Sequence, residues 1–241
     1  MKWLKEKDER VDFEKVYENE EKAKTMSGVL IYPYNTFGKN KTEITFSQHQ
    51  HRASWIGKEN QMTFYFVNKK NLTQTLKDAF VYYREEMYQQ ANLEFQKIDF
   101  TKKNYTDEEK YFTLFFYGLS LIQSSPSSHS DLIESNLVRA SAIHPFRAEP
   151  LMHLSNYFYY FLKDCKKTYF YSKISIDFQV PRDDPFFNEQ AYYMSPHNHL
   201  CTCSFSLGDI ELGRYACQKC VDWRPDDQRL KDNLEFYLKN L

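Results

Sequence analysis

Two short stretches near the C-terminus contain the residues best suited to binding a metal ion. One reads HNHLCTC from His197 to Cys203, and the other reads CQKC from Cys217 to Cys220. Imidazole nitrogen and cysteine thiolate are the ligands that zinc prefers, and four of them complete a tetrahedral structural site. In a helix, residues three or four apart lie on one face. The sequence therefore offers one candidate zinc site, made of His197, Cys201, Cys217 and Cys220.

A second pair of possible ligands lies in the stretch SQHQHR. His49 and His51 alternate along a predicted strand, so both rings would lie on one face, about 7 Å apart. No carboxylate is spaced to complete a site with them, and two ligands are a weak signal for a metal. An exposed polar face of the strand is the simpler interpretation.

The sequence favours a protein that is not an enzyme. It contains no Ser-His-Asp order and no paired carboxylates at catalytic spacing, and with only 6 glycines it has no phosphate-binding glycine loop. Lys and Arg total 32 against 33 Asp and Glu, so no excess of positive charge indicates nucleic acid as a partner. No apolar run approaches the roughly 20 residues that span a bilayer, so we expect no membrane insertion.

The cysteines and the N-terminus bear on the compartment. Five cysteines, an odd number crowded mostly into one helical region, do not read as a secreted disulfide framework. The first 24 residues are charged throughout and contain no signal-peptide core. We therefore expect a reducing compartment and a cytoplasmic protein. The glycosylation sequons of the chain include those that begin at Asn71 and Asn104, but such tripeptides occur by chance.

Residues 1–100 predict an α+β region. Residues 8–24 carry a narrow apolar stripe typical of an amphipathic surface helix. From Ser27 to residue 68, short β-branched and aromatic runs separated by Gly, Asn and Lys indicate a small antiparallel sheet. A long helix over 71–96, capped by Asn71 or Thr73, then follows.

Beyond residue 105 the pattern predicts pairs of helices with short breaks. Thr106 and Glu109 have the spacing of a capping box at the start of the first helix. The further segments of helical periodicity are 130–143, 148–163, 165–178, 188–206, 209–222 and 226–240. Aromatic residues make up 17% of the chain, which favours long helices packed through rings.

A repeat underlies these pairs. A leucine followed by a small residue recurs in the first helix of each pair, as Leu119-Ser120, Leu154-Ser155 and Leu200-Cys201. At nearly equal distances beyond these come the prolines that end the pairs, Pro145, Pro181 and Pro225. Small side chains where helices cross allow their axes to approach to about 8–10 Å. The pattern thus predicts closely stacked helix pairs.

The pattern resembles the tetratricopeptide repeat, a helix-turn-helix unit of about 34 residues. The last unit matches best, with Gly208 at its turn and Gly213, Ala216 and Cys220 in its second helix. The resemblance implies an α-helical-repeat domain, or α-solenoid, over 101–241, with a C-terminal capping helix. The expected fold is therefore α+β but mostly α, with two domains, 1–100 and 101–241.

Residues from about 106 to 241 also look like the helical repeat tails attached to some glycosyltransferases, through RAEPLMHLSNYFYY, VPRDDPFF and LGDIELGRYACQKC. This resemblance implies an accessory or degenerate component of a glycosyltransferase system. Transferase activity itself is not carried over, because the first hundred residues contain no DxD-type nucleotide-sugar motif.

The repeat gives the cysteines a second interpretation. The counterparts of Cys201, Cys217 and Cys220 in the preceding unit are Ser155, Ser172 and Ser175. Serine cannot replace a thiolate ligand, but it can replace a small side chain that fills space, and free cysteine is often buried in this way. We favour core packing, while a zinc site and a redox thiol pair remain open.

The concave face of a helical repeat usually binds an extended peptide or a helix. The inward positions implied by the repeat are Tyr117, Leu121, Glu149, Met152, Asn156, Tyr159, Asn198, Thr202 and Phe205. We expect a non-enzymatic scaffold module that binds a protein or peptide partner in this groove, without specifying its oligomeric state. The alternatives are the glycosyltransferase accessory role and a zinc-binding protein. The helix over 71–96 is an equally good occupant of the groove.

Overall fold

The computed structural model describes residues 23–24, 30–31, 63, 67–69, 72–180 and 187–240. The chain divides into two compact units, Met1–Gly57 and Lys58–Leu241. Residues 72–100, which the sequence assigns to the first domain, lie in the second unit. His49 and His51 lie outside the described residues, so their suggested site stays a prediction.

The described part of the first unit is one pair of very short strands. β1 (Ala23–Lys24) pairs antiparallel with β2 (Leu30–Ile31), with Ala23 opposite Ile31. β1 falls at the end of the predicted amphipathic helix 8–24, and the rest of that stretch lies outside the described residues.

The prediction of a small N-terminal antiparallel sheet is wrong. Among the described residues, every regular element apart from this pair of two-residue strands is a helix, and the pair is too short to form the predicted layer. In the last predicted strand, residues 61–68, the described residues Thr63, Val67 and Asn68 are helical. The periodicity of a short apolar run does not distinguish a strand from a buried helix, so QMTFYFV was open to both structures.

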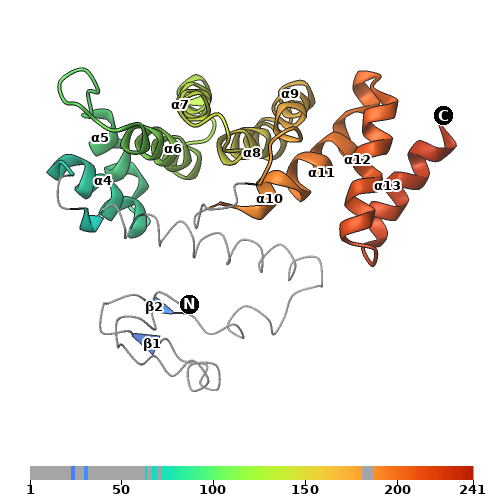
Figure 1. Ribbon diagram of the computed structural model, residues 1–241, viewed down its shortest axis with the longest axis horizontal. Helices are drawn as coiled ribbons and strands as arrows, with labels where there is room; N and C mark the ends of the chain where they lie inside the picture. The colour runs from blue at the N-terminus through green and yellow to red at the C-terminus, as the bar shows by residue number, and fades with distance from the viewer. Residues whose placement is uncertain are drawn as a thin grey trace. The chain divides into compact units, whose positions relative to one another are not determined.

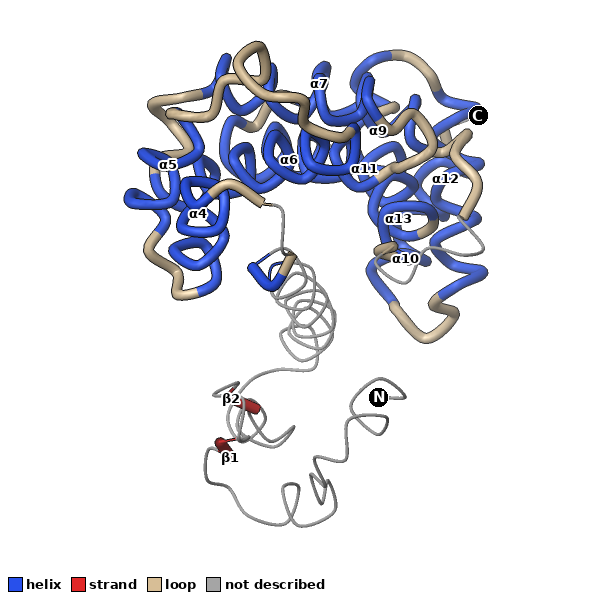
Figure 2. The backbone as a smooth tube through the Cα atoms, turned by 60° about the vertical axis from the view of Figure 1, so that its left-hand side comes forward, coloured by secondary structure: helices blue, strands red, loops and turns tan. Residues whose placement is uncertain are grey.

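The second unit is built from helices that follow one another in space (Figures 1 and 2). In chain order its described helices are α4 (Gln74–Arg84), α5 (Tyr88–Gln96), α6 (Asp107–Ser124), α7 (Ser130–Ile143), α8 (Glu149–Tyr157), the π-helix η2 (Phe158–Leu162), α9 (Cys165–Ser175), α10 (Glu189–Tyr192), α11 (Met194–Cys203), the 3-10 helix η3 (Phe205–Leu207), α12 (Ile210–Trp223) and α13 (Gln228–Lys239). Each of α4 to α9 packs on the next, α11 packs on α9, and α12 and α13 continue the row. The helical part of the predicted fold is confirmed.

The predicted single helix over 71–96 is wrong, because the chain turns back between α4 and α5, which pack on each other. Glu86 has φ 60°, and a non-glycine residue in this left-handed region does not continue a right-handed helix. The predicted cap at Thr73 is confirmed, since its Oγ1 accepts a hydrogen bond from the Leu76 N–H at 3.4 Å.

Side-chain caps explain where most of the later helices begin. The capping box is confirmed: the Glu109 N–H donates to Thr106 Oγ1 at 3.2 Å, and the Thr106 N–H donates to Glu109 Oε2 at 2.9 Å. Asp164, Asp209 and Asp227 cap α9, α12 and α13 in the same way, each accepting a backbone N–H three residues ahead. These caps satisfy N–H groups that lack partners within the helix.

Small residues lie where the helices approach most closely. A side chain at Gly118 would overlap Leu137 of α7, and one at Gly213 would overlap the ring of Tyr237. Ser120 Oγ donates to the Tyr88 carbonyl oxygen at 3.0 Å, which joins α6 to α5.

Within the described residues, no helix is both long and apolar enough to cross a membrane.

Candidate functional site

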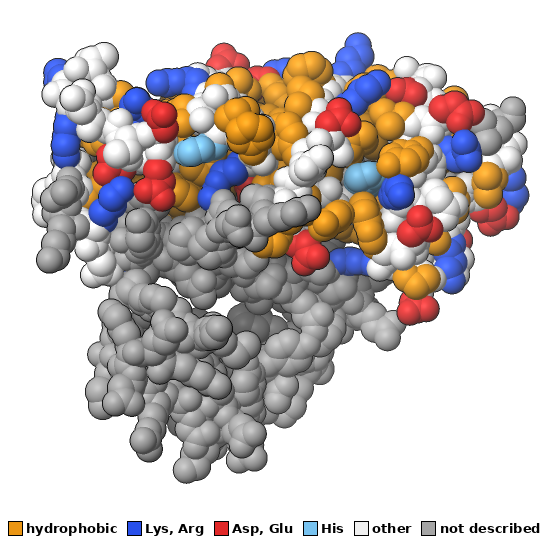
Figure 3. All heavy atoms as spheres, in the orientation of Figure 1, with side chains coloured by type: hydrophobic (Ala, Val, Ile, Leu, Met, Phe, Trp, Pro, Cys, Tyr) orange, Lys and Arg blue, Asp and Glu red, His pale blue; other side chains and the backbone are white. Residues whose placement is uncertain are grey.

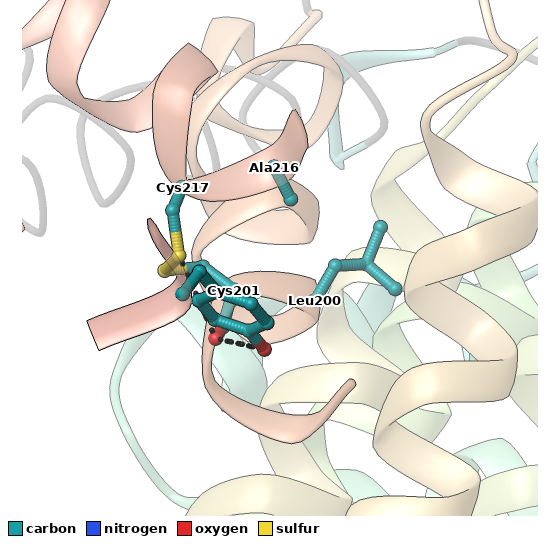
Figure 4. Close-up of a cluster of buried hydrophobic side chains, with 5 residues drawn as sticks. Leu200, Cys201, Ala216 and Cys217 are labelled. Carbon is teal, nitrogen blue, oxygen red and sulfur yellow. Dashed lines mark hydrogen bonds between the residues drawn. A yellow bond between two sulfur atoms is a disulfide. The ribbon is translucent and has the colours of Figure 1, made fainter. Parts of the chain in front are cut away.

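Two of the four predicted zinc ligands are bonded to each other. Cys201 of α11 and Cys217 of α12 form a disulfide with a Cα–Cα distance of 4.7 Å. Both are buried in one cluster with Leu200, Ala216 and Tyr237 (Figure 4). The packing interpretation is right about their burial, but it missed the covalent bond. In this form neither sulfur is a thiolate that could bind zinc.

A second disulfide joins Cys165 at the start of α9 to Cys203 of α11, with a Cα–Cα distance of 5.4 Å. Together the two bonds tie α11 to α9 and to α12. The expectation that the cysteines form no disulfide framework is wrong for four of the five. Sequence alone does not give the pairing, because it depends on which helix faces approach each other.

The other two predicted zinc ligands lie apart from this bond. Cys220 is buried and free, and burial raises the pKa of its thiol to about 12, so it stays protonated at neutral pH. The His197 ring packs edge to face on Trp223 at 4.9 Å, and its Nδ1 lies 2.7 Å from the Tyr193 carbonyl oxygen. No group of three or more metal-binding side chains occurs among the residues that the structure describes. Zinc binding by the reduced chain remains a prediction.

Packing covers three of the predicted groove positions. Leu121, Glu149 and Met152 are buried, so in this structure they are not open to a partner. Tyr117 is half-buried and stacks on Phe95 of α5, with ring centroids 5.8 Å apart. Part of the predicted 71–96 helix therefore covers this position, as one of the alternatives expected.

The connection between α9 and α11 covers Glu149 and Met152. Within it, α10 supplies Ala191 and Tyr192 to a buried cluster with Met152. Glu149 Oε1 accepts the Asn188 N–H at 2.8 Å, and Oε2 accepts the Tyr192 hydroxyl at 3.2 Å. Burial raises the pKa of Glu149, although the Asn188 N–H and the Arg147 charge oppose the rise. This carboxyl holds α10 against α8 and is not a free catalytic group.

The remaining groove positions lie on α8, η2 and α11. Asn156, Tyr159 and Asn198 are half-buried, while Thr202 and Phe205 are exposed. His199 of α11 connects the two sides, because its ring lies 4.9 Å from that of Tyr159. Phe205 packs on Phe236 of α13, with centroids 4.6 Å apart, so it is set against the last helix.

Two residues missed by the sequence interpretation complete this region. Tyr160 is 49% exposed, and its ring lies 5.9 Å from His199. Arg229 of α13 donates from Nη2 to Asn198 Oδ1 at 3.1 Å. Burial raises the pKa of Tyr160, and the positive charge of Arg229 opposes that rise, so the two are electrostatic neighbours. We call the set Asn156, Tyr159, Tyr160, Asn198, Thr202 and Arg229 the α8–α11 surface.

The sequence pattern could indicate only some of the residues of the α8–α11 surface. The repeat positions assume α-helical periodicity, whereas residues 158–162 form a π-helix, whose wider turn changes which side chains share a face. Arg229 lies on the predicted capping helix 226–240. Its contact with α11 follows from the packing of α13 on both α11 and α12, which the spacing of residues does not specify.

His199 is the buried centre of the α8–α11 surface. Its Nδ1 and Ser155 Oγ lie 3.1 Å apart and are hydrogen bonded. Burial lowers the pKa of His199 to about 4, so its ring is neutral at pH 7. Ser155 is fully buried and donates to the Met152 carbonyl oxygen at 2.9 Å. The pair fastens α11 to α8 and has no access to a substrate, so it does not form a nucleophile with its base.

Comparison with known proteins adds no assignment. No protein-family model matches the chain, and no curated protein or solved structure matches it. The geometry therefore has to carry the functional inference.

Proposed function

We propose that the helical unit is a non-enzymatic interaction module that binds a protein or peptide partner through the α8–α11 surface. The observation that carries this proposal is the convergence of Tyr160, Asn198 and Arg229 from three helical segments at one place. Tyrosine and arginine dominate the binding energy of protein interfaces. An aromatic ring, an amide and a guanidinium together offer apolar contact and directional hydrogen bonds.

The arrangement of the helices supports the proposal. Successive helices pack in chain order, which fits the proposed tetratricopeptide-like repeat, and repeat proteins commonly bind partners on such continuous faces. Figure 3 shows hydrophobic side chains side by side across one face of the helical part, with acidic and basic side chains between them.

The other functions expected from the sequence gain no support of their own. No described feature favours the glycosyltransferase accessory role, and the Cys201–Cys217 bond occupies two of the four zinc ligands. The cytoplasmic location is not part of this proposal, because disulfides persist mainly in oxidising compartments.

A capture experiment tests the proposal. The intact protein, a variant with Asn156→Ala and Tyr160→Ala, and a control Phe170→Ala are each used to retain partners from the native source. Phe170 is 57% exposed on α9 and is not part of the α8–α11 surface. We expect the intact protein and the control to retain a partner. The double variant should bind this partner at least about tenfold more weakly, which corresponds to about 1.4 kcal/mol of binding free energy. Equal binding by all three proteins would contradict the proposal.

A further inference from the structure

The two disulfides constrain where this chain matures. Four of the five cysteines are paired in two bonds, and each bond joins different helices of the second unit. Such structural disulfides form and persist in oxidising compartments and are rare where glutathione and thioredoxin keep thiols reduced. The helical unit thus has the covalent structure of a protein that passes through an oxidising compartment.

A sequon in the same unit lies where a glycan can be carried. Asn104, the first residue of Asn104-Tyr105-Thr106, is exposed in the irregular segment between α5 and α6. Its neighbour Tyr105 packs edge to face on Phe100, with ring centroids 5.4 Å apart. Thr106 caps α6. The sequon is thus anchored on one side while the Asn104 side chain lies in solvent.

We propose that Asn104 carries an N-linked glycan, added in the oxidising compartment where the two disulfides form. Surface asparagines in Asn-X-Ser/Thr are the acceptors for this modification in secreted proteins. Because Asn104 is exposed, a glycan extends into water without displacing a packed side chain. This inference rests on the disulfides and on Asn104, and it is independent of the proposed partner binding.

The chemistry is a group transfer with no change of oxidation state. Asn104 Nδ2 forms a bond to the anomeric carbon of a lipid-linked oligosaccharide diphosphate. The bond from that carbon to the diphosphate oxygen breaks, and the lipid diphosphate leaves with the electron pair while the amide loses one proton. Each disulfide forms separately, when two thiols give two electrons and two protons to a disulfide oxidant of the compartment, which becomes a dithiol.

Peptide mapping of the protein isolated from its native source tests the inference. The protein is alkylated without reductant, digested, and treated with peptide N-glycanase in heavy-oxygen water, which marks each formerly glycosylated asparagine. We expect the mark on the peptide containing Asn104, together with the peptides linked through Cys165–Cys203 and Cys201–Cys217. An unmarked Asn104 overturns the inference, whether the cysteines are paired or reduced and whichever other asparagine carries the mark.

Three variants made in the native source separate the glycan from the fold. Asn104→Gln removes the acceptor and leaves the Thr106 cap, so we expect loss of the glycan at this position with an unchanged circular dichroism spectrum. Thr106→Ser keeps both the sequon and a capping hydroxyl, so the glycan remains. Asn240→Gln, at an exposed asparagine outside any sequon, is the matched control and leaves the glycan in place. The absence of a glycan at residue 104 from the intact protein, the Thr106→Ser variant and the Asn240→Gln variant would contradict the proposal.

Discussion

The ring of Tyr237 on α13 occupies the space beside Gly213 of α12 where any other residue would place a side chain. From there the Tyr237 hydroxyl donates to the Cys201 carbonyl oxygen at 3.0 Å and accepts the Phe205 N–H at 3.0 Å. A single side chain thus joins α13 to α12, to α11 and to the turn after α11. The absence of a side chain at Gly213 is what makes this contact possible.

Gly213→Ala should therefore destabilise the protein. A new methyl group would overlap a rigid ring, and overpacking costs about 1–3 kcal/mol, more than the gain of up to about 1 kcal/mol for alanine in a helix. We expect the free energy of unfolding, measured in urea, to fall by about 1–2 kcal/mol. Gly118→Ala is the comparison, because it meets the flexible side chain of Leu137 and should cost less. A more stable Gly213→Ala protein would show that the crossing is looser than described.

Tyr237→Phe should also destabilise the protein, because it leaves the Phe205 N–H and one bond of the Cys201 carbonyl without their partner. Leaving buried polar groups unsatisfied costs about 1–3 kcal/mol. Tyr215→Phe is the matched control, because Tyr215 is 47% exposed and surface changes usually stay within about 0.5 kcal/mol. Equal urea midpoints for the two variants would rule out the described role of the Tyr237 hydroxyl.

Acid should weaken the fold through His199. Burial lowers its pKa to about 4 in the folded protein, against about 6.5 in the unfolded chain. The unfolded chain then binds more protons below pH 6.5, so stability is present above that pH and is lost as the pH falls toward 4. Between pH 7 and pH 5 this one group should remove about 2 kcal/mol.

His199→Gln tests this pH dependence, because glutamine keeps a hydrogen-bonding group near Ser155 but does not titrate. We expect the variant to lose about 2 kcal/mol less stability than the intact protein between pH 7 and pH 5. Ser155→Ala is the control, since it removes the partner of Nδ1 while His199 still titrates. It should lower stability at both pH values and keep the slope. Parallel curves for His199→Gln and the intact protein would contradict the assignment.

Each disulfide should contribute to stability. A natural disulfide of this kind typically contributes about 2–4 kcal/mol by restricting the unfolded chain. The double variant Cys201→Ala, Cys217→Ala should lose an amount in this range in urea unfolding without reductant, whereas Cys220→Ala removes no bond. After reduction, the intact protein and the double variant should differ much less. Alkylation of all five cysteines in unreduced, unfolded protein would show that neither bond exists.

Sequence patterns were most informative where a local interaction decides the structure. The capping pair Thr106 and Glu109 fixed the start of α6, and the small residues Ser120 and Gly213 correctly marked close helix crossings. Both signals act within one helix or across one contact. For that reason several helices beyond residue 105 could be predicted with nearly correct bounds. The segment predicted over 188–206, however, is divided into α10, α11 and η3, and the one over 148–163 ends in the π-helix η2.

The sequence-based predictions failed where contacts between residues far apart in the chain determine the structure. Glu86 ends a helical pattern without a glycine or proline to mark the break, so 71–96 was expected to be one helix. Glu149 and Met152 occupy inward repeat positions, but α10 covers them, and no spacing rule places a connecting segment there. The disulfide of Cys165 with Cys203 required knowledge of how α9 meets α11. The candidate site was predicted in part, through Asn156, Tyr159 and Asn198, while Tyr160 and Arg229 needed the three-dimensional arrangement.

Site-specific photo-crosslinking tests the central claim most directly. A photoreactive phenylalanine analogue replaces Tyr160 in one protein and the exposed Phe170 in another, and each is irradiated with the partner retained by the intact protein. Partner binding through the α8–α11 surface predicts a covalent product from position 160, suppressed by excess unlabelled intact protein, and none from position 170. A product from position 170 alone, or from neither position while the partner stays bound, would contradict it.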